Sequence, residues 1–240
     1  KNQKNHKKAL KLTMILGVVF TLGSMLAGDL SAKFLHQEQP EKLAAYEWHF
    51  DTESHADLVL FGSLDEKTQE VNGAIKIPGL LSFLADNNTN TEVKGLDEFP
   101  KDLQPPMIVH YYFDLMVSMG VFCLVVSGAY VLTLIFKKLR KFTHSKPMLY
   151  GALLTGPAAM LAIEFGWFLT EQGRQPWIVR GYLKVADAAT QAGGLTLVTI
   201  LFGLLYLVLM VTSAYVLIRM FKEKPAYKEV EALASERGDA

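Results

Sequence analysis

Four apolar segments constrain the fold of this chain more than any other feature. Each is long enough for a helix that crosses a bilayer, which needs about 20 residues. Hydrophobic residues make up 50% of the sequence and the mean hydropathy is +0.20, which suits a membrane protein with a sizeable polar insert. We therefore expect an all-α fold, a polytopic transmembrane helical bundle. The predicted spans are residues 9–30, 107–136, 148–169 and 195–220.

Basic residues gather beside these segments in three clusters, which all fall on one side of the predicted bilayer. By the positive-inside rule that side is cytoplasmic, so both ends of the chain are expected there. The loop between the first two spans is then outside, and its acidic residues outnumber its lysines. The clusters are Lys1, Lys4, Lys7, Lys8 and Lys11; Lys137, Lys138, Arg140, Lys141 and Lys146; and Arg219, Lys222 and Lys224.

This topology predicts three parts of the chain. Residues 1–35 form a basic start and the first span, residues 36–106 a long extracytoplasmic loop, and residues 107–240 three spans and a cytoplasmic tail. The chain begins with lysine and shows no signal-peptide pattern, so we expect the C-terminal part of a longer protein. A formal net charge of +0 gives no indication of a nucleic acid partner, and a single cysteine excludes an intrachain disulfide.

A charged stripe runs along the outer end of the third span. Glu164, Trp167, Glu171 and Arg174 follow one another at helical spacing and share one helix face. An ionisable residue at the bilayer centre costs about 2.5–3.5 kcal/mol, so the stripe should face protein, a cofactor or water rather than lipid. The alternative is an ordinary ion pair between Glu171 and Arg174 among the headgroups. Glu164, which lies further inside, is a candidate for proton transfer.

The outer loop is too long for a simple turn, and loops of this length are usually functional or disordered. Pro40 is typical of the first turn of a helix, and Lys42 and Glu47 lie about 140° apart around that helix. The two side chains could approach one small polar ligand from two sides; a solvated amphipathic helix is the alternative. Residues 77–85 are apolar but too short to span, so we expect them on the membrane surface or under a partner.

The second span carries a polar pair and a methionine. His110 and Asp114 are i,i+4 neighbours near its outer end, where they could reach the membrane interface. Met116 follows; a thioether can be an axial ligand of haem iron, although methionine in an apolar helix usually only packs. The sequence contains no Cys-x-x-Cys-His haem-attachment motif, Gly-rich phosphate loop, Ser-His-Asp candidate or zinc-ligand spacing.

Three sequence motifs, given at the end of this paragraph, occur in the same order as in subunit I of cytochrome bd quinol oxidases, which this chain resembles. The motif after the third span is highly specific, and the spans and loop correspond to the C-terminal half of that subunit, with the short outer loop of Gram-positive relatives. The resemblance implies a quinol:oxygen oxidoreductase of the bacterial cell membrane with a low-spin haem b, a high-spin haem b and a haem d. The motifs are Gln39-Pro-Glu-Lys-Leu-Ala-Ala-Tyr-Glu47, Phe113-Asp-Leu-Met-Val117 and Gly166-Trp-Phe-Leu-Thr-Glu-Gln-Gly-Arg-Gln-Pro-Trp177.

The same resemblance implies roles for individual residues. Lys42 and Glu47 match loop residues implicated in quinol oxidation. Met116 matches an axial ligand of the low-spin haem b, and Glu171 matches the carboxylate assigned to the high-spin haem b. The neighbours of that second haem are, by the same match, Trp167 and Arg174.

Two departures from the family pattern affect these expectations. Asp114 stands where well-known relatives have an arginine, so a cation near the low-spin haem must come from elsewhere or be absent. The haem-binding histidines of the family belong to an N-terminal half that this chain lacks, so the chain cannot complete any haem site alone. The implied protein partners are that N-terminal half and a second integral membrane subunit, with or without a small single-span subunit. The implied substrates are oxygen and either ubiquinol or menaquinol.

Such an enzyme would generate a proton gradient by separating proton release from proton uptake. Quinol oxidised at the outer loop releases protons outside, and oxygen reduction takes protons from the cytoplasm by a path that could include Glu164. A proton- or cation-coupled transporter without haem is the alternative, with Asp29, Asp114, Glu164 and Glu171 along its pathway. A purely structural membrane subunit is the third possibility.

Overall fold

The computed structural model describes residues 2–66, 68–190 and 192–223. Within them, four helices are long and apolar enough to cross a membrane, which confirms the predicted transmembrane helical class. The predicted tail, with Lys224, and the first residue, Lys1, lie outside the described residues. The four helices are α1 (Asn2–Glu38), α4 (Val109–Ile135), α5 (Lys146–Gly173) and α7 (Leu195–Glu223).

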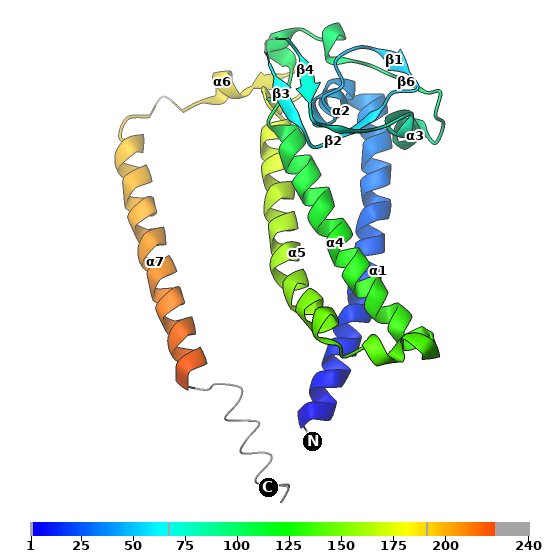
Figure 1. Cartoon of the computed structure of the whole chain (residues 1–240). Coiled ribbons are helices and arrows are strands. Elements are labelled where there is room, and N and C mark those ends of the chain that lie inside the picture. The colour runs from blue at the N-terminus through cyan, green and yellow to red at the C-terminus, as the bar shows by residue number, and fades with distance from the viewer. Residues whose placement is uncertain (1, 67, 191, 224–240) are drawn as a thin grey trace, which may run out of the picture. The chain divides into compact units, whose positions relative to one another are not determined.

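The chain divides into two compact units. In the first, Lys1–Ala188, α4 contacts both α1 and α5, and the outer loop covers one end of these helices (Figure 1). In the second, Ala189–Ala240, helix α7 buries none of its residues. The predicted boundaries after residues 35 and 106 both fall inside the first unit and stay a prediction.

Local sequence accounts for the ends of α5 and α4. α5 begins after Ser145 with a proline in its first turn and ends at Gly173, as the glycine and the nearby Pro176 predict. The basic 3-10 helix η3 (Lys137–Phe142) joins α4 to α5. It lies at the same end of the unit as the start of α1, opposite the outer loop (Figure 1). Two of the predicted basic clusters therefore share one end.

The outer loop folds into short helices and strand pairs, which the sequence did not predict beyond its first helix. α2 (Pro40–Tyr46) confirms that helix, with proline in its first turn. The strand pairs among the described loop residues are antiparallel: β1 (Glu53–Ser54) with β6 (Glu92–Val93), β2 (Leu58–Leu60) with β5 (Ile75–Ile77), and β3 (Ser63–Asp65) with β4 (Glu70–Asn72). The remaining helices are α3 (Leu80–Asp86), η1 (Leu96–Glu98) and η2 (Lys101–Leu103).

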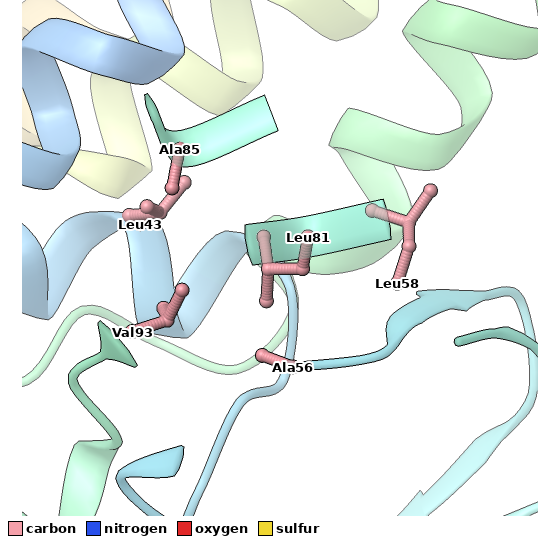
Figure 2. Packing of buried hydrophobic residues seen from close by; sticks show 6 residues of the cluster. All are labelled: Leu43, Ala56, Leu58, Leu81, Ala85 and Val93. Carbon is pink, nitrogen blue, oxygen red and sulfur yellow. The ribbon is translucent and has the colours of Figure 1, made fainter. Parts of the chain in front are cut away.

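A hydrophobic core of its own holds the loop together (Figure 2). Leu81 and Ala85 of α3 are each 1% exposed and face this core, so the apolar segment 77–85 packs inside the loop. The expectation that it lies on the membrane surface or under a partner is wrong for this face of the helix, although Phe83 remains 43% exposed. The buried core residues are Leu43, Ala56, Leu58, Leu81, Ala85 and Val93.

A second hydrophobic cluster fastens the loop to the membrane helices. Ala44, Ala45 and Tyr46 of α2 pack with Val109 of α4 and Leu169 of α5. Burying such side chains contributes about 25 cal/mol per Å² of apolar surface, so α2 is held by both helices at once. Beyond α5 the chain forms a short hairpin and one helical turn: β7 (Trp177–Val179) paired with β8 (Leu183–Lys184), then α6 (Val185–Ala188).

Candidate functional site at the junction of loop and membrane helices

α2 places the two predicted loop residues in different surroundings. Lys42 is half-buried within the helix, whereas Glu47 is the residue that caps its C-terminal end and is only 3% exposed. Lys42 lines a pocket of about 160 Å³, and Glu47 is not among the residues that line it. The approach of both side chains to one ligand therefore stays a prediction.

The pocket beside Lys42 lies between α2 and the C-terminal end of α5. Arg174 and Arg180 also line it, so three cationic side chains share a small cavity. Burial lowers the pKa of Lys42; Glu41 raises that pKa, while the two arginines lower it further. The three cations outnumber the one carboxylate of the lining, Glu41, so the pocket favours an oxygen atom or an anionic group as occupant. The other lining residues are Gln39, Glu41, Leu103, Pro105, Gly173, Gln175 and Trp177.

Glu47 is a buried carboxyl group with an unsatisfied oxygen. Its Oε2 atom has no hydrogen-bond partner among the residues that the structure describes. Burial, with a smaller contribution from the Asp114 carboxylate, raises the pKa of Glu47 to about 8. A carboxyl group with that pKa can take up and release a proton near neutral pH.

The first turns of α4 supply a buried polar pair next to the loop. His110 is 0% exposed and Asp114 is 3% exposed, with 3.3 Å between His110 Nε2 and Asp114 Oδ2. The loop binds both: the Phe61 amide donates to Asp114 Oδ2 over 2.5 Å, and His110 Nδ1 lies 2.7 Å from the Tyr46 carbonyl oxygen. Trp48 stacks on the imidazole, with 4.0 Å between the ring centroids. The position of the pair near the outer end of the span suggested that it could reach the membrane interface. In the structure the pair lies buried under the loop instead.

The predicted stripe on α5 lies on an exposed face within this chain. Trp167 is 58% exposed, the Glu171 and Arg174 side chains are each 45% exposed, and Glu164 is exposed as well. Arg174 donates from Nη2 to Glu171 Oε2 over 2.5 Å, so the i,i+3 ion pair is present. Arg174 thus approaches both Glu171 and the Lys42 pocket, whereas Glu164 lies about two helical turns from Glu171 along α5.

Met116 lies where α4 meets α5, with its thioether against Gly166. A Cβ atom at position 166 would come within 3.1 Å of the Met116 Sδ atom, so glycine leaves room for the sulfur. The residues that the structure describes contain no group of three or more His, Cys, Asp or Glu side chains arranged to hold a metal ion. Met116 and Glu171 each offer a single donor of a type that iron accepts, a thioether and a carboxylate.

Comparison with known proteins identifies the family. The sequence pattern of cytochrome bd terminal oxidase subunit I matches residues 1–225. The chain belongs to this family. The match confirms the resemblance carried by the three sequence motifs, and haem is the cofactor that membership implies.

The matches between this chain and its relatives in the family cover nearly all of the chain. Two come from Bacillus subtilis (strain 168): one, named provisionally as a cytochrome bd menaquinol oxidase subunit I, is 37% identical over 231 residues, which are 96% of this chain and 52% of the relative. The other, a cytochrome bd ubiquinol oxidase subunit 1, is 32% identical over 232 residues, which cover 90% of this chain and 49% of the relative. The bd oxidase structure from Geobacillus thermodenitrificans has a TM-score of 0.77 and 48% identity, and the match covers 92% of this chain and 50% of that one. The chain spans about half the length of these relatives.

Sequence reasoning missed two residues of the junction, Glu41 and Arg180. They form an ion pair of 2.7 Å although they are 139 positions apart in the chain. No local pattern joins residues at such a separation, so only the fold could reveal this pair. By contrast, the i,i+4 spacing of His110 and Asp114 did indicate their contact, and only their burial under the loop was not predicted.

Proposed function

We propose that this chain is the part of a quinol:oxygen oxidoreductase of the cytochrome bd type at which membrane quinol is oxidised. The observation that carries the proposal is Glu47, a buried carboxyl group with an unpartnered oxygen among the described residues and a pKa of about 8, at the junction of outer loop and α4. A quinol must lose protons as it loses electrons, and a carboxylate of this kind is a suitable acceptor. Lys42 would bind a quinol oxygen through its ammonium group.

The proposed orientation puts proton release outside the cell. The basic start of α1 and the basic η3 lie at the end of the first unit opposite the loop (Figure 1), and the positive-inside rule assigns that end to the cytoplasm. Protons accepted by Glu47 would leave to the outer side, whereas protons for oxygen reduction would enter from the cytoplasm, with Glu164 on the route. Separating the two steps would generate a proton gradient across the bacterial cell membrane.

The side chains present fit haem in their chemistry. Met116 provides a thioether in the space that Gly166 leaves, and we propose that it holds a low-spin haem b. Glu171 would hold a high-spin haem b, with Arg174 stabilising the carboxylate through the observed ion pair and Trp167 beside it. When bound, these haems and a haem d supply electron transfer and the reduction of oxygen.

The proposed partners follow from the length of the chain and its family. The relatives are about twice as long, so we propose that an N-terminal half of subunit I completes the haem sites. A second integral membrane subunit would complete the enzyme, with or without a small single-span subunit. One Bacillus relative is named for menaquinol and the other for ubiquinol, so either quinol is a candidate substrate. Family membership favours this oxidase over the haem-free transporter.

Replacing Glu47 by Gln in the full-length complex tests the proposal. Glutamine keeps the shape of the side chain but cannot accept a proton, so quinol oxidation should fall by about a hundredfold or more. The reduced-minus-oxidised visible spectrum should remain unchanged, because Glu47 is not expected to hold haem. The matched control is Glu53→Gln, an exposed position in the same loop. Parental quinol oxidation in Glu47→Gln would exclude Glu47 as the proton acceptor.

The pH profile adds a second readout for Glu47. The ionised form accepts the proton, so kcat/KM for quinol should rise with pH up to about 8 and then level off, and Glu47→Gln should lose this rise. Because the folded-state pKa is raised above the ordinary value of 4.5, the stability associated with this group is fully present below about 4.5 and is lost as pH rises towards about 8. Thermal unfolding of the loop should show the same trend, and Glu47→Gln should flatten it.

A further inference from the structure

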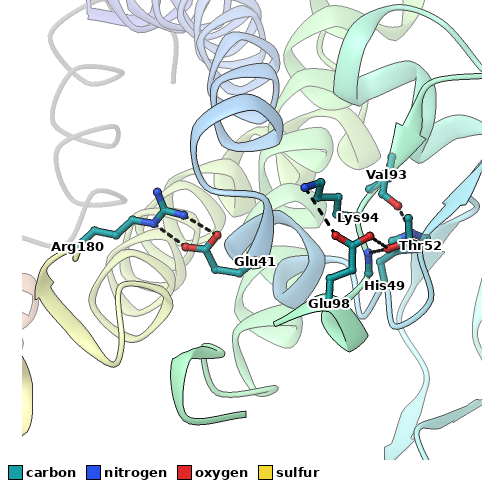
Figure 3. Close-up of polar contacts among 8 residues, drawn as sticks. Glu41, His49, Thr52, Val93, Lys94, Glu98 and Arg180 are labelled. Atoms are coloured by element: carbon teal, nitrogen blue, oxygen red, sulfur yellow. Dashed lines mark hydrogen bonds and ion pairs between the residues drawn. The ribbon is translucent and has the colours of Figure 1, made fainter. Parts of the chain in front are cut away.

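Arg180 joins the segment after α5 to the start of the outer loop (Figure 3). Its Nε and Nη2 atoms donate to the two carboxylate oxygens of Glu41 over 2.7 and 2.9 Å, and its Nη1 atom donates to the Glu38 carbonyl oxygen over 2.7 Å. Glu41 is only 8% exposed, and within the described part of the chain its carboxylate has this two-bond contact as its partner. Paired hydrogen bonds of this geometry are stronger and more selective than single ones.

The residue next to Glu41 is Lys42, whose ammonium group has no ion pair among the residues that the structure describes. It is half-buried in the pocket that it shares with Arg174 and Arg180. Glu41 is the carboxylate that acts on it electrostatically, against the effect of burial and of the two arginines. The carboxylate that could neutralise Lys42 is therefore already bound to Arg180.

We propose that Arg180 is a positioning residue for quinol oxidation, which holds the Glu41 carboxylate away from Lys42 and so leaves the Lys42 ammonium group available to a quinol oxygen. This inference rests on the proposed role of Lys42 in binding quinol. Without Arg180, a buried carboxylate would lose its partner, which is unfavourable. Lys42 lines the same pocket as Glu41, so a Glu41 carboxylate released from Arg180 can pair with the Lys42 ammonium group there and withdraw it from the substrate.

The first test compares Arg180→Ala with the double variant Arg180→Ala/Glu41→Gln in the purified full-length complex. Arg180→Ala should raise the KM for quinol about five- to tenfold, with kcat within about twofold and an unchanged haem spectrum. The double variant contains no carboxylate at position 41 to capture Lys42, so its KM should return to within about twofold of the parental value. If the KM of the double variant stayed as high as that of Arg180→Ala, the inference would be overturned. That result would mean that the Arg180–Glu41 ion pair only attaches the loop, because removing Glu41 as well cannot restore a lost attachment.

A matched control separates this effect from loop attachment in general. Lys184 donates to Asp102 over 3.0 Å and joins the same segment after α5 to the same loop, but it does not line the Lys42 pocket. Lys184→Ala should therefore leave the KM for quinol unchanged. An equal rise in KM for Lys184→Ala and Arg180→Ala would assign the effect to attachment and overturn the role of Arg180. Should Arg180→Ala not assemble, Arg180→Gln keeps part of the side chain, removes its charge and serves the same comparison.

Lys42→Ala distinguishes failure of this inference from failure of the proposed function. It should raise the KM for quinol, and adding Arg180→Ala to it should produce no further rise, because Arg180 acts through Lys42. An unchanged KM in Lys42→Ala would remove Lys42 from quinol binding. A raised KM in Lys42→Ala, together with a full additional rise in the combined variant, would leave the proposed function standing and overturn the role of Arg180.

Discussion

Asp114 shows how one side chain of a membrane helix can hold the outer loop. Its carboxylate accepts a hydrogen bond from the Phe61 amide of the loop and lies beside His110. Its negative charge also contributes to the raised pKa of Glu47. Asp114 therefore attaches the loop to α4, and its charge favours the protonated form of Glu47.

Met116 supports a prediction at the same scale. Replacing it by Leu conserves volume and hydrophobicity, so packing against Gly166 should survive while the thioether is lost. Redox titration of the full-length complex should then show a lowered potential of the low-spin haem b, or loss of its signal. Met119→Leu, in the same helix, is the control and should change neither. A parental spectrum and potential in Met116→Leu would remove Met116 from the haem ligands.

At the scale of elements, the long helices could be predicted and the strands of the loop could not. Long apolar runs define α1, α4, α5 and α7 because a span must satisfy its backbone hydrogen bonds internally. The loop strands are two or three residues long and pair with partners elsewhere in the loop, so no alternating pattern develops. α2 was predicted from Pro40, but the surroundings of its two site residues come from α4 and α5, which local sequence does not show.

The stripe on α5 makes a prediction about that helix. Glu171→Ala should remove or perturb the high-spin haem b signal, because Glu171 is the proposed iron ligand and carries the Arg174 ion pair. Glu164→Gln should leave the haem spectrum intact and slow oxygen reduction, because only proton supply is affected. Haem content and oxygen-reduction kinetics of the two variants check this difference. Equal haem loss in both variants would assign Glu164 a structural role. A full haem content in Glu171→Ala would exclude Glu171 as a haem ligand.

At the scale of the whole molecule, the first unit combines a loop that has its own core with helices that expose apolar surface. The loop is fixed through α2, whose Tyr46 reaches the end of α5 and contacts Gly173. The charged stripe on the exposed face of α5 still requires protein, cofactor or water beside it. The chain spans about half of the length of its relatives, and the haem ligands predicted in it, Met116 and Glu171, are single donors that stay a prediction.

Gly173 makes the docking of the loop on α5 directly testable. A Cβ atom at this position would meet the hydroxyl group and ring of Tyr46, so in Gly173→Ala the Tyr46 side chain must move, and we expect α2 to shift away from α5 with it. Such overpacking typically costs about 1–3 kcal/mol, and it should lower the Tm of the complex. Because Gly173 and Lys42 line the same pocket, the KM for quinol should rise as well.

Gly156→Ala is the matched control for this last prediction. It lies in the same helix, and a Cβ atom there would meet nothing within 4 Å among the described residues. Alanine should therefore leave the Tm and the KM of the complex near their parental values, since alanine also favours helix over glycine. Thermal unfolding and quinol kinetics of both variants provide the measurement. If Gly173→Ala behaved like Gly156→Ala, the contact between Tyr46 and α5 would not be what holds the outer loop in place.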